Sequence, residues 1–188
     1  MLRWNFPSNG DGQIKGVADA GIENFNGTEL SSLAREICQN SLDAAENDDK
    51  PEVMVDFFRY IVPEEKIPGI EAYRSVLNKC RLFWSKSKSE KAISFLKNAH
   101  RIASEKKNFV LRVSDYGTTG LADPYGKDDP YGINFDGWNS LIKIDGGANK
   151  GDDKAGAFGI GKNAPFCNSH YRLVFYRTLN QAGERAAQ

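Results

Sequence analysis

The chain has 188 residues, 40% of them hydrophobic, and 25 Lys and Arg balance 25 Asp and Glu. This length suggests one domain with at most an appendage, and so much apolar content excludes wholesale disorder. The formal net charge of zero excludes a uniformly basic nucleic-acid binder but leaves local patches open. Three widely spaced cysteines and two histidines argue against a zinc knuckle or a disulfide framework. The chain start lacks a signal-peptide core, and no stretch approaches the roughly 20 apolar residues of a membrane span. We therefore expect a cytoplasmic protein without a membrane contact.

The predicted elements begin with an arm and a helix. Residues 1–27 are rich in Gly, Asn and Asp and are expected to form an irregular N-terminal arm. A helix is predicted over 28–45, because Thr28 is a suitable N-cap and apolar residues recur at helical spacing after it. The run from Asp48 to Pro51 ends this helix.

The rest of the chain alternates between strands and helices. Apolar patterns predict strands over 52–62, 108–114 and 171–178, and helices over 68–85, 87–104, 138–144 and 161–168. The intervening segments 116–137 and 145–157 are dense in Gly and Asp and predict loops. This order favours an α+β fold in which helices cover one face of a mixed sheet.

The helical pair at about 63–107 carries most of the positive charge. From Arg59 to Arg112 there are 13 Lys and Arg against 5 Asp and Glu, whereas the rest of the chain has 12 against 20. A basic insertion of this kind predicts contact with a nucleic acid or an acidic protein partner. Ordinary lysines on the solvent face of an amphipathic pair are the alternative. We expect Phe83 and Trp84, which lie in this pair, to belong to its core.

A glycine-rich run near the C-terminus, Gly156-Ala-Phe-Gly-Ile-Gly-Lys-Asn163, has three interpretations. As a P-loop it fits GxxxxGK, but Asn163 stands where Ser or Thr would bind Mg²⁺, and no buried strand precedes it. As a dinucleotide fingerprint it fits GxGxxA and lacks the same strand. The third interpretation requires partners elsewhere in the chain.

One such partner is a polar stripe on the first long helix. Glu36, Asn40 and Asp43 follow at steps of four and three, so they fall within roughly 60° of one another around the helix. A solvated face is the ordinary explanation of such a stripe. Small or apolar residues cover most of the remaining circumference, which favours a helix buried nearly all round with its polar line facing a cavity.

The other partner is the run Asp115-Tyr-Gly-Thr-Thr-Gly120, which leaves the end of a predicted strand. A carboxylate there can accept a hydrogen bond from an amino group such as that of adenine, and glycine lets a backbone approach a flat ring closely. Taken alone, the run is equally a tight surface turn.

Together the three stretches resemble the GHKL ATPases, whose nucleotide site is the Bergerat fold. Glu36-Ile-Cys-Gln-Asn-Ser-Leu-Asp-Ala-Ala45 is similar to the family's ExxxN[SA]xDA helix, and Asp115-x-Gly-x-x-Gly120 and Gly156-x-x-Gly-x-Gly161 are similar to its second and third motifs. The order and separation of the motifs also fit. The resemblance covers about 28–178 apart from the helical pair. It implies a two-layer α/β sandwich with that pair inserted, an N-terminal arm over 1–27 and an ATP-binding domain over 28–188.

The resemblance also implies a role for each matching residue in the first two motifs. Glu36 would be the general base that polarises the attacking water, and Asn40 would bind Mg²⁺. Asp43 and Ala44 would line the nucleotide pocket. Asp115 would recognise the adenine amino group, beside Gly117 and Gly120, which would let the backbone approach the base.

The third motif would wrap the phosphates with backbone N–H groups where a helix begins. The residues implied there are Gly156, Phe158, Gly159, Ile160, Gly161 and Lys162. The loop at about 145–157 would be a lid that closes over ATP. One departure from the family lies in the second motif, usually DxGxG, because Thr119 takes the place of its second glycine.

A catalytic glutamate before the Asn favours hydrolysis by water, since neither His100 nor His170 lies in a dimerisation-helix motif of the histidine kinases. The resemblance thus implies a slow Mg²⁺-dependent ATPase that drives closure of a homodimer within a larger DNA- or protein-acting machine. We expect a longer protein, because Bergerat domains usually continue with further strands, and a defence or DNA-processing context. A nucleotide-sensing module without turnover and a P-loop enzyme remain alternatives.

Overall fold

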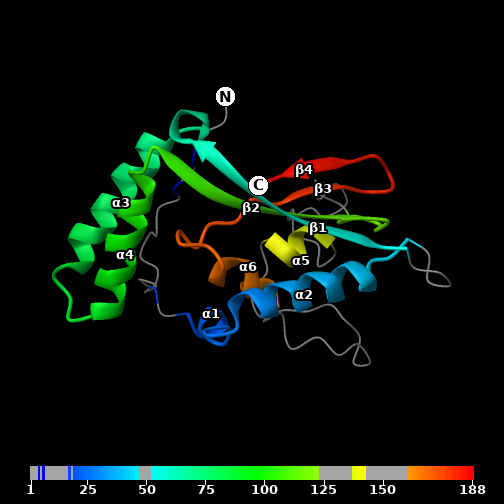
Figure 1. Cartoon of the computed structure of the whole chain (residues 1–188), viewed down its shortest axis with the longest axis horizontal. Helices are drawn as coiled ribbons and strands as arrows, with labels where there is room; N and C mark the ends of the chain where they lie inside the picture. Colours follow the sequence, from blue (N-terminus) through cyan, green and yellow to red (C-terminus); the bar gives the residue numbers. More distant parts are fainter. Residues whose placement is uncertain are drawn as a thin grey trace, which may run out of the picture. The chain divides into compact units, whose positions relative to one another are not determined.

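The computed structural model describes residues 4, 6, 17, 19–46, 52–122, 137–142 and 161–188, in two compact units. Unit 1 comprises Met1–Glu23 and Phe57–Val113, and unit 2 comprises Asn24–Asp56 and Ser114–Gln188. Helices and short antiparallel ladders make up both units, so the fold class is α+β, as expected (Figure 1). Within the described ranges, no helix is both long enough and apolar enough to cross a membrane.

Unit 1 is built around a helical hairpin. Helices α3 (Ile70–Trp84) and α4 (Glu90–Ala103) lie side by side, which confirms the two helices expected at 68–85 and 87–104 (Figure 1). The Ser89 side chain caps α4 by accepting a hydrogen bond from the Ala92 backbone N–H. Small and aliphatic side chains fill the interface and form the core of the unit: Ile70, Leu77, Ala92, Leu96, Ala99 and Ala103.

Two strands lead into and out of the hairpin. Strand β1 (Met54–Pro63) is followed by the short helix η1 (Glu64–Lys66), and β2 (Lys107–Tyr116) follows α4 and pairs with β1. At the hairpin end of this ladder, the Glu64 N–H donates to the Lys106 carbonyl at 3.0 Å. Arginines lie over aromatic rings across the ladder, with the guanidinium of Arg59 4.0 Å from the ring centre of Phe109.

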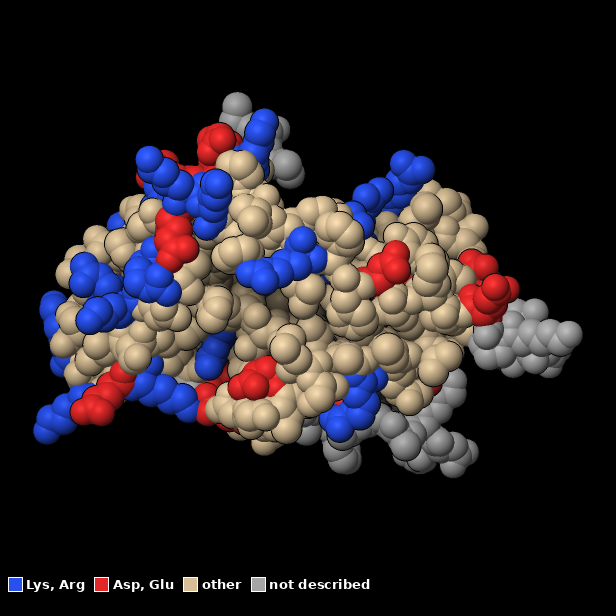
Figure 2. Space-filling model, viewed as in Figure 1, with Lys and Arg blue, Asp and Glu red and all other residues tan. Residues whose placement is uncertain are grey.

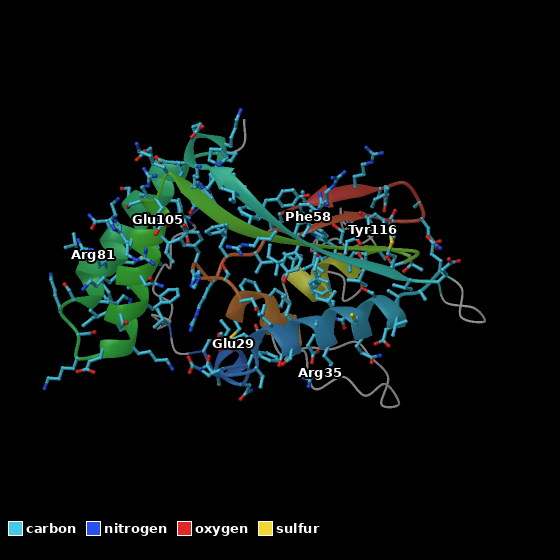
Figure 3. The ribbon with its side chains drawn as sticks, in the orientation of Figure 1. Glu29, Arg35, Phe58, Arg81, Glu105 and Tyr116 are labelled. Atoms are coloured by element: carbon cyan, nitrogen blue, oxygen red, sulfur yellow. The ribbon has the colours of Figure 1, made fainter. Side chains whose placement is uncertain are left out.

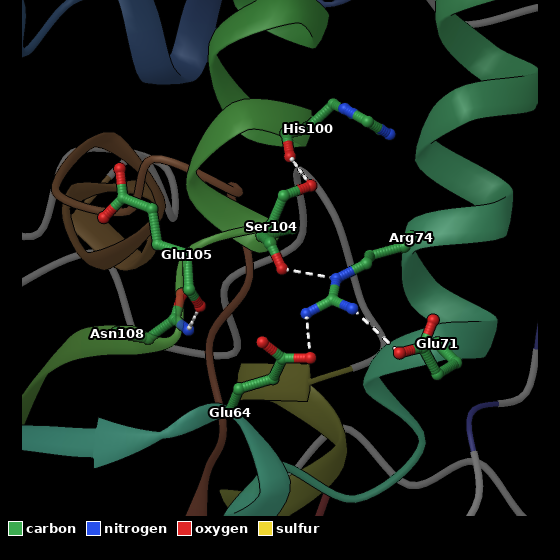
Figure 4. Close-up of polar contacts among 8 residues, drawn as sticks. Glu64, Glu71, Arg74, His100, Ser104, Glu105 and Asn108 are labelled. Carbon is green, nitrogen blue, oxygen red and sulfur yellow. Dashed lines mark hydrogen bonds and ion pairs between the residues drawn. The ribbon is translucent and has the colours of Figure 1, made fainter.

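Arg74 ties this ladder end to both helices (Figure 4). Its Nε donates to the Ala103 carbonyl at 2.6 Å, one Nη lies 2.5 Å from a Glu64 carboxylate oxygen, and the other donates to Glu71 at 2.8 Å. The pKa of Arg74 is raised, chiefly by its contact with Glu64. The side chain is only 17% exposed, so this contact links α3, η1 and the end of α4 from a largely desolvated position.

The N-terminal arm is not wholly irregular, contrary to expectation. Helix α1 (Ala20–Glu23) forms where the side chain of Asp19 accepts a hydrogen bond from the Gly21 N–H at 2.8 Å, a local bond that favours a helix start. Further upstream, the Trp4 indole donates to the Pro68 carbonyl at 2.9 Å and stacks on Tyr73 at 5.0 Å. These contacts attach part of the arm to the start of α3.

Unit 2 contains α2 (Glu29–Asp43), which confirms the first predicted helix, together with the outer ends of β1 and β2. The other elements of unit 2 are short: α5 (Gly137–Ile142), η2 (Gly161–Asn163), α6 (Ala164–Cys167), β3 (Arg177–Leu179) and β4 (Arg185–Ala187). The helices expected at 138–144 and 161–168 therefore form, although the second one begins as a 3₁₀ turn.

The described strands form two separate pairs, β1 with β2 and β3 with β4, where one mixed sheet was expected. Positive φ angles at Gly117 and Gly120 (72° and 69°) turn the chain out of strand geometry just after β2. The segment after β2 therefore contacts the β3–β4 pair through individual hydrogen bonds, such as the one from the Gln181 N–H to the Thr119 carbonyl at 3.2 Å.

The strand expected at 171–178 is shorter and lies later than predicted. Arg172 has a positive φ of 50°, which interrupts an extended backbone, and β3 begins only at Arg177. β3 then pairs antiparallel with β4, a strand that the sequence pattern did not predict, with Arg177 opposite Ala187.

Candidate nucleotide site

Helix α2 carries the polar stripe of Glu36, Asn40 and Asp43. The Glu36 carboxylate is partly buried and pairs with Arg35 at 3.3 Å, whereas Asn40 and Asp43 are exposed (Figure 3 labels Arg35). The Asp43 carboxylate accepts a hydrogen bond from the Gln39 amide at 2.7 Å. The stripe therefore begins half-buried at Glu36 and opens to solvent toward the C-terminal end of the helix.

The sequence predicted that this helix is buried nearly all round, and that prediction is wrong. Leu30 and Leu42 are 72% and 54% exposed, and the buried residues are confined to Ser32, Leu33 and Ser41. In the part of unit 2 that the structure describes, α2 packs against α6, and its C-terminal end contacts the segment after β2.

Asp115, at the end of β2, is fastened to this helix. Its Oδ2 accepts a hydrogen bond from the Ser41 hydroxyl at 3.2 Å and one from the Thr118 hydroxyl at 3.4 Å. None of the described residues donates to Oδ1, and the residue is exposed. The carboxylate is thus held in a fixed orientation with one oxygen open to a further donor.

Backbone hydrogen bonds lock the end of α2 to the loop after Asp115. The Glu46 N–H donates to the Gly117 carbonyl at 3.0 Å, and the Thr119 N–H donates to the Ala44 carbonyl at 2.9 Å. Ala45 and Thr118 form an isolated antiparallel bridge between these bonds. The structure therefore brings the first and second sequence motifs together.

The two glycines of the second motif are required by the backbone itself. Gly117 has a φ of 72°, and a Cβ there would collide with the carbonyl of Glu52. Gly120 has a φ of 69° and lies equally close to the backbone of Leu179. Both positions combine a left-handed conformation with a close approach to a neighbouring chain, so packing explains each glycine without a ligand.

The last glycine of the third motif lies against Glu36. A Cβ added to Gly161 would overlap the Glu36 carboxylate, with 3.0 Å to its Cδ. Next to Gly161, α6 is held to α2 by Asn168, whose amide donates to the carbonyl of Glu29 at 2.9 Å. Among the described residues, the second motif and the last glycine of the third motif therefore both contact α2, which carries the first motif.

Several of the expected site residues lie outside the described residues. These are Gly156, Phe158, Gly159 and Ile160, together with the lid expected at about 145–157. Lys162 is described and is half-buried in η2, directly after Gly161. Among the described residues, no group of three or more His, Cys, Asp or Glu side chains is arranged to hold a metal ion.

Sequence reasoning did not assign Ser41 and Thr118, which orient Asp115. Ser41 is only 3% exposed and lies one helical turn after Ile37, at an apolar register. A hydroxyl at a core position of an amphipathic helix requires a hydrogen-bond partner. The position of Ser41 in the helical pattern could therefore have indicated that its side chain bonds to another polar group. Thr118 lies within a turn and carried no comparable signal.

Comparisons of the chain with models of protein families, with curated proteins and with solved structures find no match.

Proposed function

We propose that unit 2 is a Bergerat-type ATP-binding module of the GHKL class that hydrolyses ATP slowly with Mg²⁺ and drives closure of a dimer in a larger DNA- or protein-acting machine. The observation that carries this proposal is that Asp115 of the second motif and Gly161, the last glycine of the third, both contact α2, the helix of the first motif. Asp115 contacts Ser41, the neighbour of Asn40, and Gly161 abuts Glu36. A candidate adenine acceptor at the end of β2 therefore lies beside the helix that carries a candidate metal ligand and a candidate base.

The carboxylate of Asp115 suits the recognition of an amino group. Its Oδ2 accepts hydrogen bonds from two hydroxyl groups. Its Oδ1 accepts none from the described residues and can accept one from a ligand. Because Ser41 and Thr118 fix the carboxylate, little conformational entropy is lost when a ligand binds it. A purine with an exocyclic amino group, as in adenine, satisfies this acceptor.

Glu36 lies one helical turn before Asn40, on the same side of α2. In the proposed reaction its carboxylate, which pairs with Arg35, polarises the attacking water. Mg²⁺, when bound, would neutralise phosphate charge. The side-chain amide of Asn40 is an oxygen donor suited to Mg²⁺, which commonly takes one or two protein ligands and completes its shell with phosphates and water.

The proposal is tested by measuring ATP binding and Mg²⁺-dependent phosphate release on the full-length protein. Glu36→Ala should keep ATP affinity and abolish hydrolysis. Glu29→Gln is the matched control, because Glu29 lies on the same face of α2 two turns earlier and should hydrolyse ATP at the wild-type rate. If the wild-type protein and Glu36→Ala bind ATP equally and neither hydrolyses it, the module senses nucleotide and the enzymatic part of the proposal is wrong.

Asp115→Asn tests the adenine contact. Loss of a charge-assisted hydrogen bond should weaken ATP binding by about 10- to 100-fold. The control is Asp56→Asn, which removes an exposed carboxylate from the same unit and should leave the affinity unchanged. Equal affinity of Asp115→Asn and the wild-type protein would refute the pocket assignment.

A further inference from the structure

The turn that joins α3 to α4 presents a basic surface in unit 1, which we call the basic tip: Lys79, Leu82, Phe83, Lys86 and Lys88. No acidic residue occurs between Glu71 and Glu90. Figure 2 shows Lys and Arg gathered over the helical hairpin, at the left of the view. Within the basic tip, no acidic residue lies between the lysines in the sequence.

The lysines of the basic tip are not neutralised within the described chain. Elsewhere in unit 1, Arg74, Lys91 and Arg101 each form an ion pair with a glutamate. By contrast, Lys79, Lys86 and Lys88 are exposed and form no ion pair with any residue that the structure describes. Their charge is therefore available to an anionic partner.

Two large apolar side chains lie among these lysines. Leu82 and Phe83 are 53% and 55% exposed, so the expectation that Phe83 belongs to the core is wrong. The core side of α3 is already filled by residues such as Leu77, leaving Phe83 on the solvent side. Trp84 is half-buried and meets the Phe83 ring edge-on at 5.7 Å, which holds the phenyl ring in place.

We propose that the basic tip binds single-stranded nucleic acid, with its lysines on the phosphates and the Phe83 ring stacked on a base. Lysines that track a phosphate backbone and an exposed aromatic ring on which a base stacks are the two components of such sites. The side-chain oxygen of nearby Asn78, which could otherwise recognise a base edge, already accepts a hydrogen bond from Arg81 at 2.9 Å (Figure 3 labels Arg81). The binding should therefore depend little on base sequence.

The arrangement of the tip favours this partner over an anionic membrane. Around α3, Leu82 and Phe83 are about 100° apart, and Lys79 projects between them one turn earlier, at about 60° from Leu82. A charged side chain thus separates the two apolar ones. Membrane-binding helices instead gather their apolar residues on one continuous face.

The proposal is independent of the ATP site, since the basic tip lies in unit 1 and the three motifs lie in unit 2. It is tested in the absence of ATP, by fluorescence anisotropy of the full chain with labelled oligothymidylate of about 20 nucleotides. Affinity is measured between about 50 and 200 mM salt, and vesicles of phosphatidylserine and phosphatidylcholine are tested in parallel.

Two variants test the two components of the site. Replacing Lys79, Lys86 and Lys88 by Ser should reduce the slope of log K against log salt concentration by about 2. Phe83→Leu should weaken binding by about 5- to 100-fold while leaving the salt slope unchanged. If the triple variant unfolds, Lys86→Ser with Lys88→Ser, confined to the turn, should still reduce the slope by about 1.4.

The matched control replaces Lys66, Lys106 and Lys107 by Ser, which removes three exposed lysines from the opposite end of the same hairpin. This variant should bind like the wild-type protein. The proposal is overturned if the wild-type chain does not bind oligothymidylate at the lowest salt concentration, or if the control loses as much affinity as the tip variant. Binding to vesicles without binding to oligothymidylate overturns it as well.

Discussion

Gly161→Ala is the most informative single change, because it displaces the proposed base while leaving the fold in place. Gly161 begins the 3₁₀ turn η2, a right-handed helical conformation that alanine adopts readily. The added Cβ would collide with the Glu36 carboxylate, which is the mobile end of a flexible side chain and can move aside. We therefore expect the thermal unfolding midpoint to stay within a few degrees of the wild-type value.

The size of the displacement sets the size of the effect on hydrolysis. The Cβ would overlap Oε2 of Glu36 and lie 3.0 Å from its Cδ, whereas ordinary contacts are about 3.5–4.0 Å, so the carboxyl group must move by at least about 1 Å. A shift of about 1 Å in a reacting group costs up to about 10²-fold in rate. We predict that Gly161→Ala retains ATP affinity and lowers Mg²⁺-dependent phosphate release by about 10- to 100-fold.

A double variant separates this mechanism from a general disturbance of the site. If the effect acts through Glu36 alone, adding Gly161→Ala to Glu36→Ala should leave the ATP affinity unchanged, whereas a general disturbance of the site should weaken it. Ala164→Gly, which removes a fully buried methyl group from the neighbouring α6, shows how loss of stability alone affects hydrolysis. Wild-type hydrolysis by Gly161→Ala, in a protein that Glu36→Ala inactivates, would refute the reasoning.

Two further predictions concern stability. Arg74→Ala should lower the free energy of unfolding by about 2–4 kcal/mol, because it leaves Glu64 and the Ala103 carbonyl without their partner, whereas Glu71→Gln, at a side chain that is 79% exposed, should cost less than about 0.5 kcal/mol. Urea unfolding measures both, and equal losses would contradict the role of burial. Burial raises the pKa of Tyr176 from 10.0 to about 12, so the unfolded chain loses this proton first, and the stability should fall as pH rises through this window. The slope is at most about 1.4 kcal/mol per pH unit, reduced by partial exposure of the phenol, and Tyr176→Phe should remove it; identical slopes in both proteins would exclude this origin.

The apolar periodicity of the sequence was enough to predict α2, α3 and α4. In each helix the residues that face the core recur at the helical period, as Leu77 in α3 and Leu96 in α4 do. Such patterns are local, so they survive without knowledge of the neighbouring elements. They fail where a helix packs on one side only: Phe83 was expected in the core and Leu30 on the apolar side of α2, yet both are exposed.

Only the tertiary structure decided which polar residues meet. Ser41 and Asp115 are 74 residues apart, and their hydrogen bond depends on how the chain returns after the helical hairpin. The same holds for Gly161 against Glu36 and for Gly117 against the backbone of Glu52. The sequence by itself determined the helices and the order of the three motifs, because spacing along a chain encodes local structure. The contacts that join those motifs depend on chain reversals and close backbone approaches, which no local pattern encodes.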